Sequence, residues 1–142
     1  MQLNASLFFN GQCEGAFQFY EQWLGGRIEA MIPPAGTSAE QHTPPEWRDK
    51  ILHARLAVNG GVPMASGAPP DRSDGAARGF PVNIGVEDPG EAERTFRAMA
   101  GQVLAGGGTV RMPIQQTFRA ERFGMPVDES GTPWTIDCEG KQ

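Results

Sequence analysis

The amino-acid sequence predicts an α+β fold in which two βαβββ modules follow one another along the chain. The main observation is an order of strand, helix and three strands that occurs twice, with helix starts near Cys13 and Asp88. A second observation is that the chain contains 19 glycines and 12 prolines, many of them between the expected helices and strands. Short elements joined by tight turns are typical of such a composition. An internal repeat of this kind determines the architecture.

The first module is predicted at about residues 1–67. It opens with a strand at residues 3–10, where apolar and polar side chains alternate up to the turn signal Asn10-Gly11. A helix follows at residues 13–24, because its apolar side chains recur at spacings of three and four. The pair Gly25-Gly26 ends this helix, since glycine accepts the left-handed conformation that helix ends favour.

Three further strands complete the first module, at residues 27–32, 51–59 and 62–66. In the middle strand of the three, alternation directs Ala54 and Leu56 toward the core and places His53 on the opposite face. The segment 33–45, which precedes that strand, is rich in proline and polar residues. We expect this segment to be a mobile loop and treat it as a candidate lid.

A linker is predicted at residues 68–78, and the second module, at about 79–142, repeats the order of the first. A strand at residues 80–87 leads into Asp88-Pro89, where aspartate caps a helix start and proline fits the first turn. The three glycines at 106–108 end this helix. Three more strands follow, at residues 109–113, 121–127 and 134–139.

The last two strands and the turn between them, Asp128 to Gly131, form a hairpin that we predict to line one wall of a cavity. In its first strand Phe123 and Met125 share a face with Glu121, but the sequence does not decide which face points inward. A four-stranded sheet with a helix on one face leaves its other face uncovered. Two such modules can therefore enclose a cleft between their uncovered faces.

Composition limits the partners of the chain. The net charge is -5, and the 12 lysines and arginines form no basic stripe, which argues against nucleic acid and anionic membranes as partners. The N-terminus has no features of a signal peptide, and no segment is long and apolar enough for a transmembrane helix. Because Cys13 and Cys138 form no Cys-x-x-Cys pair, we expect no disulfide framework and a cytoplasmic protein.

Several stretches, taken together, resemble the vicinal oxygen chelate superfamily of glyoxalases, extradiol dioxygenases and bleomycin-resistance proteins, and within it the PhnB-like group. The matching stretches are Leu-Phe-Phe-Asn-Gly-Gln-Cys-Glu-Gly-Ala-Phe-Gln-Phe-Tyr at 7–20, Pro-Pro-Glu-Trp-Arg-Asp-Lys-Ile-Leu-His-Ala at 44–54, Met-Ala-Ser at 64–66, Val-Glu-Asp-Pro-Gly-Glu-Ala-Glu at 86–93, and Gln-Thr-Phe-Arg-Ala-Glu-Arg-Phe-Gly-Met at 116–125, continuing to Trp134. The resemblance implies one domain over residues 1–142, cupped mixed sheets around a cavity, and a homodimer whose cavities draw on both chains.

The resemblance also implies where a metal ion would be held. Metal-dependent members use four ligands, one on each of four cavity-facing strands, and these places correspond to Ala5, residues 64–66, Pro81 and Thr135. None of them holds a histidine, cysteine or carboxylate, so we expect no metal site and no cofactor. A divalent metal enters only as an alternative, in which a displaced site uses His53 and Asp137.

We expect a mainly apolar cavity with a few polar contacts. Its apolar lining is predicted to be Leu7, Phe9, Phe118, Phe123 and Met125. The ligand-binding residues predicted from the sequence are His53, Asn83, Phe118, Glu121, Phe123, Thr135, Asp137 and Trp47. Trp47 is among them because a large aromatic side chain near a cleft often contacts a ligand. No catalytic residue is identified, and Cys13 is interpreted as a packed residue at a helix start, although that position can lower a thiol pKa.

The leading hypothesis is a metal-free homodimer that binds an unidentified small molecule, with bleomycin-resistance-type sequestration as the nearest example in the superfamily. The alternative is a metal-dependent lyase, isomerase or dioxygenase-type enzyme with a displaced metal site. A third hypothesis is a scaffold whose dimer interface matters more than its cavity. The sequence decides neither whether the chain is an enzyme nor which ligand it takes.

Overall fold

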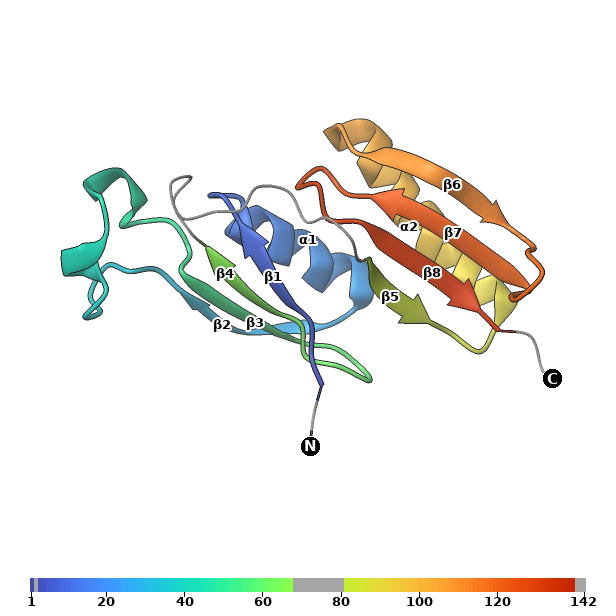
Figure 1. Ribbon diagram of the computed structural model, residues 1–142, viewed down its shortest axis with the longest axis horizontal. Coiled ribbons are helices and arrows are strands. Elements are labelled where there is room, and N and C mark those ends of the chain that lie inside the picture. The colour runs from blue at the N-terminus through green and yellow to red at the C-terminus, as the bar shows by residue number, and fades with distance from the viewer. Residues whose placement is uncertain (2, 68–80, 140–142) are drawn as a thin grey trace. The chain divides into compact units, whose positions relative to one another are not determined.

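The computed structural model describes residues 1, 3–67 and 81–139, and the chain divides into two compact units, Met1–Ala76 and Ala77–Gln142 (Figure 1). The predicted linker at 68–78 lies outside the described residues. Each unit contains one four-stranded sheet and one α-helix. The α+β class and the tandem βαβββ order are therefore confirmed.

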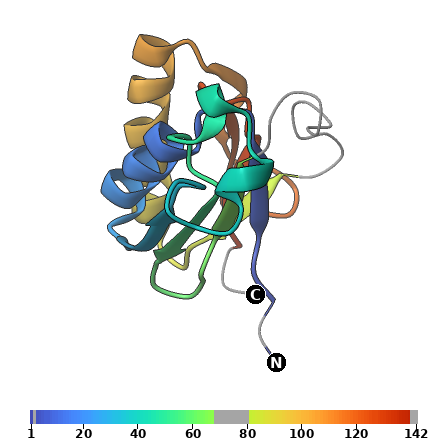
Figure 2. The same ribbon diagram turned by 90° about the vertical axis from the view of Figure 1, so that its left-hand side faces the viewer.

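The first unit is a mixed sheet with one helix along one face (Figures 1 and 2). Its elements are β1 (Ser6–Phe9), α1 (Cys13–Leu24), β2 (Arg27–Ile32), β3 (His53–Ala57) and β4 (Met64–Gly67). The strands lie in the order β1-β4-β3-β2, with β1 parallel to β4 and the other neighbours antiparallel. Strand β1, the first of the unit, thus pairs with β4, the last, at one edge of an open sheet.

Helix α1 has the predicted bounds and buries three residues of its predicted apolar stripe, while the fourth, Leu24, is half-buried. Ala16, Phe17 and Tyr20 are buried, and the ring of Phe17 meets the ring of Phe9 edge to face, with centroids 6.2 Å apart. Gly25 ends the helix at a φ of 66°, a left-handed conformation in which a side chain would be strained. This apolar layer between α1 and the sheet is the core of the unit.

The alternation of strand β1 is confirmed, but the role predicted for its apolar residues is wrong. Leu7 and Phe9 are each only 3% exposed and lie on the face that α1 covers, whereas Phe8, between them, is 72% exposed. Leu7 and Phe9 therefore belong to the core and cannot line a ligand cavity. Apolar residues under a helix and apolar residues facing a cavity have the same sequence pattern, which is why alternation alone did not separate them.

The proline-rich segment of unit 1 contains two short 3-10 helices, η1 (Glu40–His42) and η2 (Pro45–Trp47). Local hydrogen bonds support it: the Thr37 hydroxyl donates to the Pro34 carbonyl at 2.7 Å, and the Gly36 amide donates to a Glu40 carboxylate oxygen at 2.9 Å. The segment thus has more regular structure than its composition predicts. Its mobility and its role as a lid stay predictions.

The second unit repeats the arrangement with a longer helix (Figure 1). They are β5 (Val82–Gly85), α2 (Pro89–Gly106), β6 (Thr109–Gln115), β7 (Arg122–Val127) and β8 (Trp134–Cys138). The strand order is β5-β8-β7-β6, with β5 parallel to β8 and the other neighbours antiparallel. The position of β5 beside β8 places the start of this unit next to its C-terminal strand.

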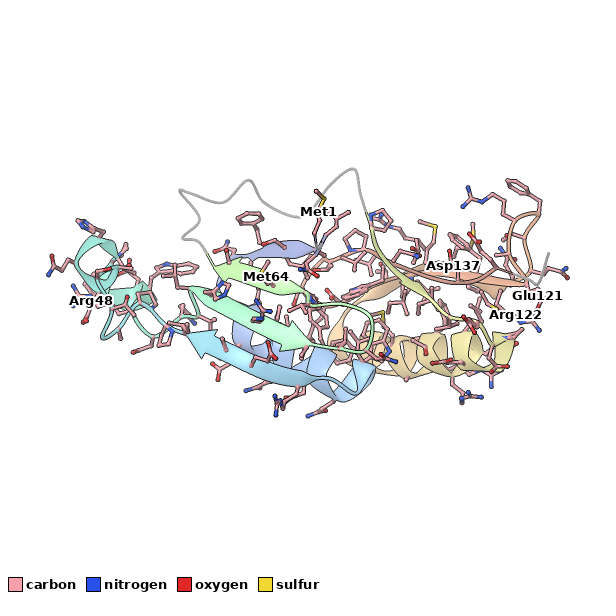
Figure 3. All side chains as sticks on the ribbon, turned by 90° about the horizontal axis from the view of Figure 1, so that it is seen from below. Met1, Arg48, Met64, Glu121, Arg122 and Asp137 are labelled. Carbon is pink, nitrogen blue, oxygen red and sulfur yellow. The ribbon has the colours of Figure 1, made fainter. Side chains whose placement is uncertain are left out.

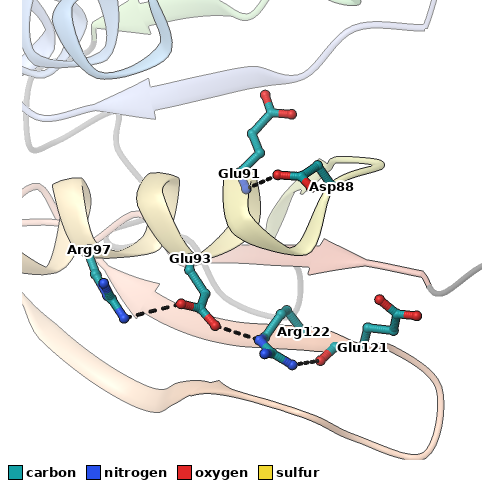
Figure 4. Close-up of polar contacts among 6 residues, drawn as sticks. All are labelled: Asp88, Glu91, Glu93, Arg97, Glu121 and Arg122. Carbon is teal, nitrogen blue, oxygen red and sulfur yellow. Dashed lines mark hydrogen bonds and ion pairs between the residues drawn. The ribbon is translucent and has the colours of Figure 1, made fainter.

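Helix α2 begins as its sequence predicts. The Glu91 amide donates to the side chain of Asp88 at 2.7 Å, which confirms Asp88 as the capping residue (Figure 4). Ala92, Phe96 and Met99 are buried beneath the helix. Among the described residues, no helix is long and apolar enough to cross a membrane.

The turn between β7 and β8 is held by a buried carboxylate. Asp128, which is 4% exposed, accepts hydrogen bonds at 3.0 Å from both the Thr132 amide and the indole Nε1 of Trp134. The Gly131 amide also donates to the Asp128 carbonyl, and Gly131 has a φ of 83°. The predicted turn from Asp128 to Gly131 is thus confirmed, and the hairpin is stabilised through the side chain at its first position.

Candidate functional site

A close contact shows which face of the second sheet is covered by α2. A Cβ atom placed on Gly124 would lie 2.6 Å from ring carbons of Phe96, so glycine is needed for the helix to approach β7. Gly124 pairs directly with Ile136, and Ile136 pairs with Ile84, so all three residues lie on the helix-covered face. Their neighbours along the strands lie on the uncovered face, which answers the question that the sequence left open for residues 121–127.

The uncovered face gathers residues from three strands, and we call it the open face of unit 2. It comprises Asn83 and Gly85 of β5, Thr135 and Asp137 of β8, and Phe123 and Met125 of β7. The register pairs Asn83 with Thr135, and Asp137 with both Gly85 and Phe123. Figure 3 shows Asp137 on the side of the sheet that faces away from α2. Four residues predicted from the sequence, Asn83, Phe123, Thr135 and Asp137, are thereby brought together.

One hydrogen bond orients the polar part of the open face. The Thr135 hydroxyl donates to the amide oxygen Oδ1 of Asn83 at 2.6 Å. This bond links β8 to β5 and assigns the oxygen of the Asn83 amide to the side of Thr135. The amide nitrogen Nδ2 of Asn83, which carries two donor hydrogens, consequently lies on the side of Gly85.

Gly85, the last residue of the edge strand β5, leaves a gap on this face. A Cβ atom at Gly85 would lie 3.4 Å from Oδ1 of Asp137 and 3.8 Å from Nδ2 of Asn83. A hydrogen-bond donor and an acceptor therefore both lie near the same empty position. Sequence reasoning did not single out Gly85, although the alternation of Asn83, Ile84 and Gly85 indicated that it shares a face with Asn83.

The carboxylate of Asp137 is available to a ligand within the part of the chain that the structure describes. No ion pair or side-chain hydrogen bond joins it to another described residue, and the residue is half-buried. Asp128, by contrast, is enclosed by Thr132 and Trp134. Of these two aspartates in the hairpin, Asp137 is thus the one suited to recognition and Asp128 the one suited to stability.

Two of the other predicted site residues lie in unit 1. His53 is half-buried on β3, on the face away from α1, where it pairs with Ser66 and Ile32 in the neighbouring strands. Trp47 lies over Gly11, since a Cβ atom on that glycine would be 3.5 Å from the Trp47 ring. The observed contact of Trp47 is thus with the turn between β1 and α1, and it ties the proline-rich segment to that turn.

Phe118 and Glu121 lie in the connection from β6 to β7, outside both strands. Phe118 is 98% exposed, and Glu121 is exposed as well. The Glu121 carbonyl accepts a hydrogen bond from the guanidinium of Arg122 at 2.7 Å (Figure 4). The Glu121 amide donates to the Cys138 carbonyl of β8 at 2.9 Å. Ligand binding by Phe118 and Glu121 stays a prediction.

Both cysteines are buried and unsuited to nucleophilic chemistry. Burial, reinforced by the neighbouring Glu14 carboxylate, raises the pKa of the Cys13 thiol to about 12. Burial also raises the pKa of Cys138, with Glu121 as the next cause. A thiol that stays protonated near neutral pH is a poor nucleophile, so the interpretation of Cys13 as a packed helix-start residue is supported.

The donor atoms on the uncovered faces do not fit a transition metal. In strands β1, β4, β5 and β8 those faces carry Ser6, Phe8, Met64, Ser66, Asn83, Gly85, Thr135 and Asp137. Asp137 is the one carboxylate in this set, which contains no histidine or cysteine. Among residues 1, 3–67 and 81–139, no three His, Cys, Asp or Glu side chains come together in a way that could hold a metal ion. Zinc and related metals require several such ligands.

Comparison with known proteins identifies relatives that span the whole chain. The protein PA1353 from Pseudomonas aeruginosa is 40% identical, with a TM-score of 0.84 and coverage of 99% of both chains. Protein YjdN of Escherichia coli strain K12 is 28% identical over 150 residues, covering 100% of this chain and 98% of its own. No protein-family model matches the chain.

More distant structures share the fold. The PhnB protein from Bacillus cereus is 19% identical with a TM-score of 0.75, covering 97% of this chain and 99% of its own. A glyoxalase/bleomycin resistance protein/dioxygenase from Nocardioides is 12% identical with a TM-score of 0.62, covering 99% and 85%. The resemblance to the vicinal oxygen chelate superfamily and its PhnB-like group is thus confirmed at the level of the fold.

Proposed function

Because the chain belongs to the family of Pseudomonas aeruginosa PA1353 and has the fold of glyoxalase/bleomycin resistance/dioxygenase proteins, we propose that it is a metal-free, dimeric small-molecule-binding protein. The binding surface is the open face of unit 2. Binding there needs no chemical step, as in the sequestration of a compound by a resistance protein. The function is the one that the sequence favoured, and we now propose specific residues for it.

The observation that carries the proposal is the pairing of apolar and polar groups on the open face. Phe123 and Met125 are half-buried and offer apolar contact area. Beside them, Asp137 offers a carboxylate without a described partner and Asn83 offers amide hydrogens. Small-molecule sites combine apolar surface with a few placed polar groups in this way.

The metal-free part of the proposal rests on the donor set. A single carboxylate surrounded by hydroxyl, amide and thioether groups binds a divalent transition metal weakly. Elemental analysis of protein purified without chelator should find less than about a tenth of an equivalent of transition metal, far from the stoichiometric content of a structural site. A full equivalent that disappears in His53→Ala would favour the alternative, a metal-dependent enzyme with a displaced site.

The dimeric part of the proposal is supported by exposed aromatic side chains in both units. Phe8 lies on the uncovered face of the first sheet, and Phe118 lies in the β6–β7 connection. Large exposed apolar side chains often mark surfaces that a partner covers. Sedimentation equilibrium should give the mass of two chains, with Phe8→Ser or Phe118→Ser shifting the protein toward monomer. A monomer in the unaltered protein would contradict this part.

A thermal-shift screen against metals and small metabolites tests the binding function, because a compound that binds only the native state raises the midpoint of unfolding. Compounds that raise it should do so less in Asp137→Asn. Glu129→Gln is the matched control, since it removes one charge from an exposed position in the same hairpin. If no metabolite raises the midpoint, or if both variants behave alike, the open face is not the binding surface.

A further inference from the structure

We propose that the open face of unit 2 recognises a neutral ligand through a hydroxyl group, which sits over Gly85 between the Asn83 amide and the Asp137 carboxylate. The inference rests on the proposed function and narrows it from any small molecule to a chemical class. That class is an uncharged compound with a hydroxyl group next to an apolar or aromatic portion.

The Asn83 amide has a defined direction. Its oxygen accepts the hydrogen bond from Thr135 at 2.6 Å, so the nitrogen is turned toward Gly85. The opposite orientation would bring the amide oxygen close to the Asp137 carboxylate, with two acceptors facing the same space. Next to Gly85, Asn83 therefore presents donor hydrogens from the same strand, and Asp137 presents acceptor lone pairs from β8.

Two distances describe the gap at Gly85. The position of an absent Cβ at Gly85 is 3.4 Å from Oδ1 of Asp137 and 3.8 Å from Nδ2 of Asn83. We place the ligand oxygen outward from this position, above the Gly85 Cα, where hydrogen bonds to both side chains can form. Gly85 and Asn83 are exposed, so the position is open to solvent and to a ligand.

A donor and an acceptor side by side favour one functional group of the ligand over others. A hydroxyl group accepts one hydrogen bond from Asn83 and donates another to Asp137, so both side chains are satisfied. An ammonium group satisfies Asp137 but leaves the donor hydrogens of Asn83 facing another donor. A carboxylate group satisfies Asn83 but lies against the negative charge of Asp137, which weakens its binding.

Apolar side chains lie where the rest of the ligand would be. Phe123 pairs directly with Asp137 across the two strands, and Met125 lies two residues farther along the same face. An apolar group attached to the hydroxyl-bearing carbon would contact these side chains. Methionine adapts its shape to different partners, and its sulfur contacts aromatic rings favourably.

The test uses four probes that share a ring and differ in one substituent: benzyl alcohol, toluene, benzylamine and benzoate. Each is titrated into the full-length protein while the amide signals are followed by NMR. We expect benzyl alcohol to bind about tenfold more tightly than toluene, since two hydrogen bonds are added. We also expect it to bind more tightly than benzylamine or benzoate, with the largest shifts at Gly85 and at the side-chain amide of Asn83.

A substitution that fills the gap provides the matched comparison. Gly85→Ala places a methyl group in ordinary van der Waals contact with its neighbours, at a backbone conformation open to any residue, so the fold should be retained. It should weaken benzyl alcohol binding about tenfold and leave toluene binding nearly unchanged. Gly101→Ala is the control, because nothing lies within 4 Å of its added methyl group on α2.

The outcomes separate this inference from the proposed function. Equal affinities for benzyl alcohol and toluene, or tighter binding of benzylamine, would overturn the hydroxyl preference while open-face binding stands. Unchanged benzyl alcohol affinity in Gly85→Ala would also overturn the position over Gly85. If none of the four probes shifts an amide of the open face at millimolar concentration, both the inference and the binding function at this face fail.

Discussion

The hydroxyl of Thr135 donates to the side-chain oxygen of Asn83 at 2.6 Å and joins the two parallel strands β8 and β5 through their side chains. Thr135 is buried, whereas Asn83 is exposed. The bond thus holds an exposed amide in one orientation from a buried anchor. The polar arrangement of the open face depends on this anchor.

Removal of that anchor should disorganise the open face without unfolding the protein. Thr135→Val keeps the shape of the side chain but removes the hydroxyl, so we expect a loss of about 1 kcal/mol in the free energy of unfolding. Urea unfolding measures this loss, and NMR should show the Asn83 side-chain amide in exchange between orientations. Thr135→Ser retains the donor and should keep a single orientation. Identical Asn83 signals in both variants would show that the bond does not orient the amide.

The buried carboxylate of Asp128 should be the most costly polar group to remove from the hairpin. Asp128→Ala leaves the Trp134 indole and the Thr132 amide without this acceptor in a buried site. We expect a loss of about 2–4 kcal/mol, because two buried donors lose this charged acceptor. Urea unfolding followed by tryptophan fluorescence measures it. The adjacent exposed residue gives the control, Glu129→Ala, and a similar loss there would contradict the assigned role.

The contact between Gly124 and Phe96 predicts a coupled pair of substitutions. Gly124→Ala forces the new methyl group against the Phe96 ring, and we expect a loss of about 1–3 kcal/mol. In a Phe96→Leu background the same substitution should cost less, because the ring that it meets has gone. Chemical unfolding of the four proteins measures the coupling. Additive losses would mean that the helix does not approach the sheet at Gly124.

The Cys13 thiol should make stability fall at alkaline pH. Burial raises its pKa in the folded protein from 9.0 to about 12, so the unfolded chain releases its proton first. Stability is therefore fully present below pH 9 and declines as pH rises toward 12, at a slope of roughly 1.4 kcal/mol per pH unit. Cys13→Ala should reduce the slope of the unfolding free energy against pH in that window. An unchanged slope would contradict the burial of the thiol.

The ion pair between Glu93 and Arg122 should contribute at neutral pH and vanish in acid. Their atoms lie 2.7 Å apart, and Arg97 also reaches Glu93 at 3.2 Å (Figure 4). The hydrogen bond from Arg122, followed by the charges of Arg122 and Arg97, lowers the pKa of Glu93. The stabilisation is thus present above the unfolded pKa of 4.5 and is lost as pH falls through the lower folded value.

The variant Arg122→Gln should reduce the free energy of unfolding at pH 7 only slightly, because solvent screens this half-exposed pair. The difference from the unaltered protein should shrink as pH is lowered below 4.5. Arg94→Gln is the control, since Arg94 meets Asp88 only at 3.7 Å and both are largely exposed. A pH-independent difference in Arg122→Gln would point to packing as its cause.

The sequence predicted most of the fold because the local signals agreed with one another. Glycines ended both helices, and Asp88 capped the start of the second helix. The alternation of apolar and polar residues marked the strands. Strand ends were less certain: β1 begins at Ser6 and not at residue 3, because pairing with β4 starts there. Pairing partners are distant in sequence, so the alternation of one strand cannot reveal where its ladder begins.

The candidate site was only partly predictable. Alternation showed that Thr135 and Asp137 share a face, but the side of the sheet under α2 became known only from the contact between Gly124 and Phe96. Leu7 and Phe9 were assigned to the cavity because alternation does not show which side of a sheet a helix covers, and they proved to be core. Gly85 was missed because its contribution is the absence of a side chain, which acquires meaning only beside Asn83 and Asp137.

Intermolecular nuclear Overhauser effects with benzyl alcohol show whether the open face of unit 2 takes a small molecule. We expect contacts from the ring protons of benzyl alcohol to Phe123 and the Met125 methyl group, and from its benzylic protons to the Asn83 side-chain amide. Contacts confined to residues of the α2-covered face or of unit 1, or no intermolecular contact at millimolar concentration, would contradict binding at the open face.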